Sequence, residues 1–200
     1  MKGVSILGAG GHSRSLISCL DALNISVLNV YDEQSQKSES IMGIKVSSFE
    51  HSSNIENLIL AIGDNNKRKF FLESYYTKLW LENIIHPSAW LDKTSVLGNA
   101  NQVLCGAYVG PETKIGINNI VNTHAVVEHE SVIGDHNHIS VSTKLLGRVR
   151  VGDRCFIGAG VVVKEGISIG DDIVIGANSF VNEHLLVPGV YVGAPIRRIE

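Results

Sequence analysis

The side chains best suited to chemistry are gathered in one short stretch of the chain, residues 122–138. Half of the eight histidines lie there: His124, His129, His136 and His138. His129 stands between Glu128 and Glu130, and a carboxylate beside an imidazole fixes its tautomer, as a general base requires. We therefore expect His129 to act as a general base, with either neighbouring glutamate as its support.

This histidine segment lies inside a repeat with a period of six residues. Stepping by six from Ile85 to Val187 meets an aliphatic residue at all eighteen positions, and glycine directly follows eight of them. Neither a helix, with a period of 3.6, nor an ordinary strand, with a period of 2, keeps one phase of six over this length. The pattern is a hexapeptide repeat, which is typical of solenoid folds.

The period also predicts the geometry of the solenoid. Three hexads make one triangular coil of 18 residues, with the aliphatic residues pointing inward and parallel backbone ladders joining successive coils. Glycine after the aliphatic residue suits a sharp corner or a close approach of two backbones. Corners with positive φ are associated with left-handed members of this repeat class. We expect a left-handed parallel β-helix of nearly six coils over 85–187, with no loop longer than a corner.

His124 and His129 also allow a second interpretation, a metal site. Zinc enzymes of the γ carbonic anhydrase type, which are β-helices, use this spacing of two histidines but need three imidazoles. The positions one and two coils before His124 are Gly106 and Ser88, which supply no third ligand. We therefore expect no metal.

The composition changes near residues 80–86, and this change predicts a domain boundary. Residues 1–84 hold 6 glycines and no proline, whereas residues 85–200 hold 14 glycines and all 4 prolines. In the first part, hydrophobic periodicity predicts strands at 4–7, 25–31 and 58–62 and helices at 13–23 and 65–78. We expect a small Rossmann-like α/β domain at 1–84, followed by the β-helix domain at 85–200.

Ligands bind Rossmann-like sheets at the carboxyl ends of the strands, where this sequence has Gly8–His12, Asp32-Glu33 and Ala61–Asn65. The glycine-rich turn is not the dinucleotide fingerprint, because Ser13 stands where the third glycine is required. It is either a tight turn that needs positive φ or a phosphate site made by N–H groups at a helix N-terminus. An acidic strand end can hold a ribose hydroxyl or a uracil N–H. Because about eighty residues are few for a full dinucleotide-binding fold, a nucleotide-sugar fits better than NAD.

The overall composition excludes several functional classes. The net charge of −3 gives no electrostatic case for binding nucleic acid or an anionic membrane. No stretch approaches the ~18 apolar residues of a spanning helix, and the apolar run at 4–7 is too short for a signal peptide. Three cysteines without a CxxC pair indicate neither a disulfide framework nor a zinc knuckle. We expect a soluble, cytoplasmic protein without membrane insertion.

Several motifs together resemble one known family. They are Gly8-Ala9-Gly10-Gly11-His12, the hexads, Asn122-Thr123, Glu128-His129-Glu130, Ile133-Gly134-Asp135, His138 and the ending Val192-Gly193-Ala194-Pro195-Ile196-Arg197. The chain resembles, over essentially its whole length, the sugar O- and N-acetyltransferases related to the bacillosamine N-acetyltransferase and the sialic-acid O-acetyltransferase. The resemblance implies an acetyl-CoA-dependent homotrimer, with CoA between neighbouring β-helices.

The resemblance also implies roles for individual residues. His129 is then the base, Glu130 tunes it, and His138, nine residues on, contacts the acetyl group. Contacts with the CoA backbone fall on Gly147, Ala159 and Ala177. Contacts with a nucleotide-sugar fall on Gly10, Gly11, His12, Asp32, Glu33, Ala61 and Asp64. Glu33 replaces an aspartate of the bacillosamine enzyme and Asp64 replaces an asparagine, which leaves the base and the sugar open.

The function expected from these residues is direct transfer of an acetyl group from acetyl-CoA to the amino group of a nucleotide-linked amino sugar. Asp32 favours a nucleotide ligand, because a free sialic acid carries a carboxylate and would prefer a basic site. O-acetylation of a sialic acid or a related surface-glycan sugar is the alternative within the family. A non-catalytic assembly or sugar-sensing module is the alternative outside it.

Overall fold

The structure is a computed structural model that describes residues 3–35, 39–50 and 55–199. It consists of two compact units, Met1–Glu82 and Asn83–Glu200. The division falls two residues before the boundary expected from composition. No helix in the described part of the chain is long and apolar enough to cross a membrane.

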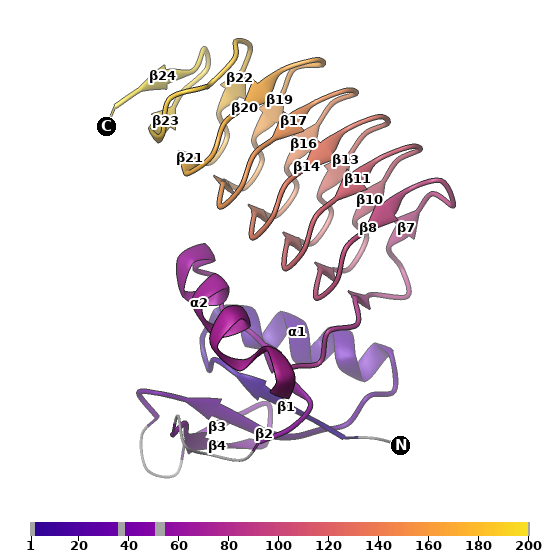
Figure 1. Ribbon diagram of the computed structural model, residues 1–200, viewed down its shortest axis with the longest axis vertical. Coiled ribbons are helices and arrows are strands. Elements are labelled where there is room, and N and C mark those ends of the chain that lie inside the picture. The colour runs from indigo at the N-terminus through magenta and orange to yellow at the C-terminus, as the bar shows by residue number, and fades with distance from the viewer. Residues whose placement is uncertain (1–2, 36–38, 51–54, 200) are drawn as a thin grey trace. The chain divides into compact units, whose positions relative to one another are not determined.

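The first unit is an α/β unit built on a five-stranded sheet. Its elements are β1 (Val4–Leu7), α1 (Gly11–Ala22), β2 (Val27–Asp32), β3 (Ser40–Ile41), β4 (Ile44–Ser48), β5 (Leu58–Leu60), α2 (Asn65–Tyr75) and the 3₁₀ helix η1 (Tyr76–Lys78). The strand order is β3-β4-β2-β1-β5, and Figure 1 labels β1 to β4. Because β1 runs parallel to both β2 and β5, the carboxyl ends of these three strands share one edge of the sheet.

The hydrophobic spacing of the two helices accounts for their packing. Leu16 and Leu20 of α1 are fully buried, as are Phe71 and Leu72 of α2 within a few per cent. The Phe71 ring also meets Phe49 edge-on, with ring centroids 5.8 Å apart. These contacts hold both helices against the rest of the first unit.

The hairpin of β3 and β4 is an element that the sequence did not predict. Its turn is made by Met42 and Gly43, with φ of 51° and 80°, and two successive positive φ values are typical of a tight hairpin turn. The strands pair antiparallel, with Ile41 opposite Ile44. β3 is only two residues long, Ser40–Ile41, which is too short for an alternating pattern to predict it.

The second unit is a parallel β-helix. Its strands are β6 (Ile84–Ile85), β7 (Trp90–Leu91), β8 (Val96–Leu97), β9 (Gln102–Val103), β10 (Tyr108–Val109), β11 (Lys114–Ile115), β12 (Ile120–Val121), β13 (Val126–Val127), β14 (Val132–Ile133), β15 (His138–Ile139), β16 (Lys144–Leu145), β17 (Arg150–Val151), β18 (Phe156–Ile157), β19 (Val162–Val163), β20 (Ser168–Ile169), β21 (Ile173–Ile175), β22 (Phe180–Val181), β23 (Gly189–Val192) and β24 (Arg197–Arg198). From β6 to β22, strands three apart in this order pair in parallel, as Val109 does with Val127 and Val127 with Leu145. At the end of the chain, β23 pairs parallel with β21, and β24 pairs antiparallel with β23. Each regular coil therefore spans 18 residues, as the sequence predicted. Figure 1 shows these coils stacked along the second unit.

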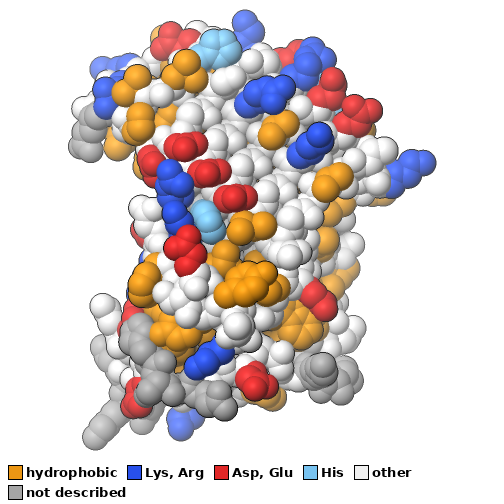
Figure 2. Space-filling model, viewed as in Figure 1, with side chains coloured by type: hydrophobic (Ala, Val, Ile, Leu, Met, Phe, Trp, Pro, Cys, Tyr) orange, Lys and Arg blue, Asp and Glu red, His pale blue; other side chains and the backbone are white. Residues whose placement is uncertain are grey.

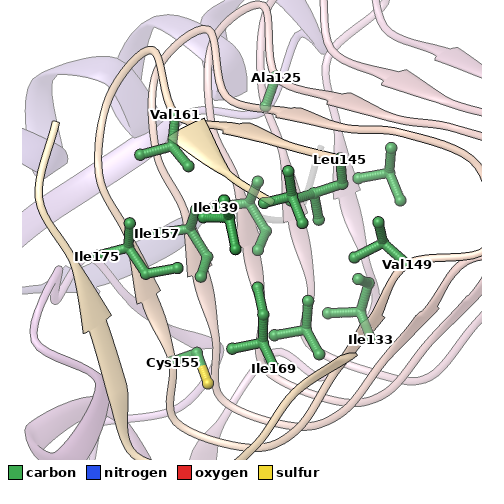
Figure 3. Packing of buried hydrophobic residues seen from close by; sticks show 14 of the residues in the cluster. Ala125, Ile133, Ile139, Leu145, Val149, Cys155, Ile157, Val161, Ile169 and Ile175 are labelled. Carbon is green, nitrogen blue, oxygen red and sulfur yellow. The ribbon is translucent and has the colours of Figure 1, made fainter. Parts of the chain in front are cut away.

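The inward aliphatic residues form one continuous core along the β-helix. Ile139, Ile157 and Ile175 are fully buried and stack from coil to coil, and Leu145 is buried on a second face of the coil (Figure 3). The six-residue phase holds to Val181 and then ends.

The prediction that Val187 is the last inward-pointing residue is wrong. Its side chain is 53% exposed, whereas Leu185 is buried and bridges to Ile169. The final turn is two residues shorter than the others, so the inward position moves from Val187 to Leu185. No long loop interrupts the coils before this point.

The corners explain why glycine follows so many aliphatic residues. Positive φ falls three residues after the inward position, mostly on other residue types, such as Glu112, Glu130 and Arg148 with φ of 57°, 58° and 60°. The glycines that follow the inward residues instead allow the next coil to approach closely. A Cβ on Gly134 would collide with the Asp153 carboxylate of the next coil, whose Oδ1 accepts from the Asp135 N–H.

An asparagine ladder holds another edge of the coils together. The Asn101 Oδ1 accepts from the Asn119 N–H and the Asn119 Oδ1 from the Asn137 N–H, at 2.8 and 2.7 Å. Asn83 begins this ladder, because its Oδ1 accepts from the Asn101 N–H at 2.8 Å. This bond accounts for the division of the chain before Asn83.

Candidate active site

The predicted base lies on the corner between β13 and β14. His129 Nδ1 lies 3.0 Å from Glu130 Oε2. A carboxylate only accepts hydrogen bonds, so Nδ1 carries the hydrogen, and Nε2 of the neutral ring carries the free lone pair. No hydrogen bond joins the Glu128 side chain to His129 in the part of the chain that the structure describes. The geometry therefore places Glu130, rather than Glu128, against the imidazole.

Gly147 lies directly beneath the imidazole, one coil further on. A Cβ at this position would be 2.5 Å from both Cε1 and Nε2 of His129. Gly147 is not among the residues with positive φ, so its backbone conformation does not require glycine. The ring of His129 is what excludes a side chain at this position.

Glu130 has a second partner, Arg148, which occupies the equivalent corner position of the next coil. Arg148 Nη1 donates to Glu130 Oε2 at 3.3 Å, and its Nη2 pairs with Glu165. The hydrogen bond from His129, and then the contact with Arg148, hold the pKa of Glu130 below its usual range. Glu130 is therefore ionised at neutral pH, which suits the support of a base.

A shallow pocket of about 420 Å³ lies beside this corner. It is lined by Thr94, Glu112, Lys114, Glu130, Val132 and Arg150. Figure 2 shows acidic side chains beside basic ones on one face of the protein. Through this pocket, the Glu130 side of the site is accessible from the surface.

The remaining candidates of the β-helix lie elsewhere in the coil. His138 begins β15, where its Nε2 lies 3.0 Å from Asn122 Nδ2 and its ring meets Phe156 edge-on. Ala159 and Ala177 lie one coil apart on the corners that follow β18 and β21. A strand of the face that holds β13, β16 and β19 separates these corners from that of His129. One chain therefore does not bring the two groups of candidates together.

The glycine-rich turn of the first unit is open to a ligand. Gly10 is the N-cap of α1, with φ of −76° and ψ of −168°. A Cβ on Gly10 or Gly11 would meet nothing within 4 Å. Positive φ is needed only at Gly8, at 112°, so the tight turn does not explain the other two glycines. No side chain caps the N-terminus of the helix, and His12 lies half-buried in its first turn.

Asp32 reaches across from the end of β2 and holds this turn. Its Oδ2 accepts from the Ala9 N–H at 2.7 Å, and its Oδ1 accepts from the Gln34 N–H at 2.8 Å. The predicted nucleotide acceptor is therefore also a brace for the glycine-rich turn. The Ala9 N–H is occupied by this bond, so a phosphate would have to use the N–H groups that follow it.

The other predicted residues of this edge also have structural partners. Glu33 forms an ion pair with Lys67, with 2.7 Å between Oε2 and Nζ. Asp64 is the N-cap of α2, and its Oδ1 accepts from the Lys67 N–H at 2.7 Å. The Ala61 side chain is buried, and its carbonyl faces Gly8, so Ala61 offers a ligand only backbone atoms.

A buried arginine shapes the loop that contains Ala61 and Asp64. Arg68 is fully buried, and its guanidinium donates to the Ile62 and Gly63 carbonyls at 3.1 and 3.3 Å. Burial lowers the pKa of Arg68 to about 9, against a smaller opposing effect of Asp64. Sequence reasoning missed this residue, because a basic position early in a helix reads as exposed.

The structure gives no geometry for a metal ion. Among the described residues, no three or more His, Cys, Asp or Glu side chains lie together in a way that could hold one. His124 stacks on Gly106, whose Cβ would be 2.5 Å from its Nδ1.

Comparison with known protein families matches both units. The PglD N-terminal domain matches residues 3–75. The bacterial transferase hexapeptide family (six repeats) matches residues 130–165, and the hexapeptide repeat of succinyl-transferase matches residues 148–183. A comparison with curated protein sequences gives no match.

Solved structures resemble the whole chain. PerB from Caulobacter crescentus, in complex with CoA and GDP-perosamine, is 30% identical with a TM-score of 0.89, covering 100% of this chain and 98% of that one. The chain belongs to the hexapeptide-repeat sugar acetyltransferases. The acetyltransferase domain of PglB from Neisseria gonorrhoeae shares the fold at 22% identity, with a TM-score of 0.89 and full coverage of both chains.

The acetyltransferase thus has the predicted fold, a Rossmann-like unit followed by a left-handed parallel β-helix, and acetyl-CoA is its acetyl donor. Arg148 is a second residue of this acetyltransferase, after Arg68, that sequence reasoning did not find. The signal was present, because Arg148 follows Glu130 by 18 residues, the length of one coil.

Proposed function

We propose that the protein transfers the acetyl group of acetyl-CoA to the amino group of a nucleotide-linked amino sugar. The observation that carries this proposal is the His129–Glu130 pair, which leaves Nε2 with a lone pair above a glycine that admits no side chain. The complex of PerB with CoA and GDP-perosamine supports the same substrate class. The N-acetyl reaction also agrees with perosamine N-acetyltransferase from the same bacterium, a variant of which matches with a TM-score of 0.91.

The proton transfer follows from the geometry. The amine nitrogen forms a bond to the thioester carbonyl carbon, and His129 Nε2 takes the amine proton. The bond from that carbon to sulfur then breaks, and CoA leaves as a thiolate that accepts a proton to become the free thiol. Glu130 stabilises the imidazolium that results, and such base catalysis typically contributes 10²–10⁴-fold. The Gly147 N–H, which donates to no group in the described chain, supports the negative charge on the carbonyl oxygen.

The first unit, residues 1–82, is assigned to the nucleotide-sugar. Gly10, Gly11 and His12 form the open start of α1, where N–H groups and the helix dipole attract phosphate. Asp32 keeps that turn in place, and lone pairs of its carboxylate remain for a hydroxyl or a base N–H. The ion pair of Glu33 and the capping bond of Asp64 favour roles for these two residues in holding the edge of the sheet.

The second unit, residues 83–200, is assigned to acetyl-CoA, and the active form is a homotrimer. His129 and Gly147 lie on one corner of the coil, whereas Ala159 and Ala177 lie on another. A neighbouring subunit can supply the second corner to the first, with His138 beside it, and so complete a groove for CoA. A cytoplasmic location is part of this proposal, because acetyl-CoA is a cytoplasmic metabolite.

The experiment is a thiol-release assay with acetyl-CoA across a panel of UDP-, dTDP- and GDP-linked amino sugars, with the matching hydroxyl sugars as controls. Release with an amino sugar, and an amide in the product by mass spectrometry and NMR, is the expected result. Release only with the hydroxyl sugars, or with a sialic acid, would indicate O-acetylation. No release with any sugar would favour a non-catalytic module.

Two further measurements test the roles assigned to the residues and the subunits. His129→Ala is expected to lose turnover about 100-fold or more while it keeps its dissociation constants for CoA and the sugar. A loss below about 10-fold would remove His129 as the base. Light scattering is expected to give three times the chain mass, and a value near 21.6 kDa would reject the trimer.

A further inference from the structure

A chain of charged side chains continues from the base across three coils of the β-helix. Arg148 Nη1 donates to Glu130 Oε2 at 3.3 Å, and the same oxygen lies 3.0 Å from His129 Nδ1. The other end of the guanidinium pairs with Glu165. We propose that Arg148, itself held by Glu165, is a positioning residue that fixes the Glu130 carboxylate on the imidazole; this inference rests on the proposed role of His129.

The backbone of the corner brings these groups together. Glu130 and Arg148 occupy the same corner position in successive coils, each with φ near 60°. The equivalent position of the following coil is Gly166, where a Cβ would meet nothing within 4 Å. That open space leaves Glu165 accessible to the guanidinium. His129, Gly147 and Glu165 stack one coil apart, next to the stack formed by Glu130, Arg148 and Gly166. The chain of contacts uses residues of both stacks.

The geometry gives Arg148 two separate effects. A guanidinium offers several donors in a planar fork, so it can hold Glu130 and Glu165 at the same time. Its positive charge also offsets the negative charge that Glu130 places beside His129. Without Arg148, the carboxylate loses one of its two donors and its charge acts on the imidazole alone. The protonated imidazole is then favoured, which removes the base form at low pH.

Other charged groups face the same carboxylate and set the background for this effect. They are His129, Arg148 and Glu165 on the corner, and Glu112, Lys114 and Arg150 around the pocket. Arg148 is the cation among them that touches Glu130 in the described structure. Removal of Arg148 therefore changes the electrostatic potential at the Glu130 carboxylate more than removal of Lys114 or Arg150 does.

The alternative is a purely structural role, in which Arg148 only ties successive coils together. Exposed ion pairs contribute little to stability, which makes this role a weak one. Arg148 is 55% exposed. A tie between coils would affect the melting temperature and leave the pH dependence of the reaction unchanged. A positioning role has the opposite signature, which is a change in the pH profile and in kcat with little change in the melting temperature or in the KM for acetyl-CoA.

The test compares Arg148→Gln, Arg148→Lys and Glu165→Gln with Arg154→Gln. The last is a matched control, because Arg154 forms bidentate contacts of 2.7 Å with Asp172 on a different corner. Arg148→Gln is expected to lower kcat about 2- to 5-fold. It is also expected to move the acidic limb of kcat/KM to higher pH by about 0.2–0.7 unit. Arg148→Lys should restore the limb, Glu165→Gln should show a smaller change in kcat, and Arg154→Gln should match the wild type.

A second readout needs no substrate and separates this inference from the proposed function. The ¹⁵N chemical shifts of the His129 ring report which nitrogen carries the hydrogen in the neutral form. The wild type is expected to show hydrogen on Nδ1, and Arg148→Gln to shift population toward hydrogen on Nε2. Unchanged ring shifts and an unchanged pH profile in Arg148→Gln would overturn the positioning role. A wild type inactive on every sugar, with the ring shift still present in the variant, would reject the proposed function alone.

Discussion

Gly147→Ala places a single methyl group under the base and leaves the base itself unchanged. The new Cβ would lie 2.5 Å from Cε1 and Nε2 of His129, well inside ordinary contact. The imidazole therefore has to move by about 1 Å, and misplacement of a reacting group by this distance can reduce the rate about 100-fold. We expect kcat/KM to fall about 100-fold, which corresponds to roughly 2.7 kcal/mol of transition-state stabilisation.

The fold should tolerate the same change. The atoms in conflict are at the end of a side chain that is 44% exposed, so the ring can swing aside without disturbing the backbone of the coil. The assay is thiol release at saturating acetyl-CoA, with the melting temperature measured in parallel. Gly170→Ala is the matched control, because its Cβ would meet nothing closer than 3.3 Å.

A double-mutant cycle isolates the contact between the two residues. In a His129→Ala background there is no ring to displace, so Gly147→Ala should cause no further loss of rate. The reasoning fails if Gly147→Ala keeps kcat/KM within about 3-fold of the wild type. It also fails if the loss persists in the His129→Ala background, because the methyl group would then act on something other than the imidazole.

Three further outcomes follow from contacts in the structure. Asp32→Ala removes the hydrogen bond from the Ala9 N–H and any contact of the carboxylate with the ligand, and is expected to raise the KM for the nucleotide-sugar about 10-fold or more, leaving that for acetyl-CoA unchanged; equal values would show that Asp32 contributes to sugar binding neither directly nor through the turn. Burial raises the pKa of the Cys155 thiol to about 12, so a disulfide reagent at pH 8 should modify the exposed Cys105 and spare Cys155, as peptide mapping would show. Asp64→Ala removes the N-cap of α2 and should lower the free energy of unfolding by about 1 kcal/mol in a urea titration, and no change would indicate that the cap is redundant.

The long-range order of the β-helix was predictable because it is written in the sequence as a strict period. Every inward position from Ile85 to Val181 follows from the hexads, and so does the stacking of residues 18 apart. The prediction for Val187 was wrong because the last turn is shortened where Leu185 forms a backbone bridge with Ile169. A periodic sequence pattern does not record such a bridge.

Local contacts at the site were less accessible to sequence reasoning. Both glutamates beside His129 have the right chemistry, and only the left-handed backbone at Glu130 turns its carboxylate toward Nδ1. Arg148 joins the site through a side-chain conformation, which depends on Glu165 and on the open space at Gly166. In the first unit, Asp32 was predicted to face a ligand, and its bonds to two backbone N–H groups depend on the path of the glycine-rich turn.

The stacking of equivalent positions limits how the length of this protein can change during evolution. An insertion or deletion within the coils that is not a multiple of six residues would shift the hexad phase, as the two-residue shortening of the final turn does when it moves the inward position from Val187 to Leu185. An insertion or deletion of six or twelve residues would keep the core, but every later corner would then stack on a corner of another edge of the coil. Only the gain or loss of 18 residues leaves both the core and the ladders intact, and even then only outside the coils that carry His129, Gly147 and Glu165. Natural relatives should therefore differ in length by whole coils beyond these positions.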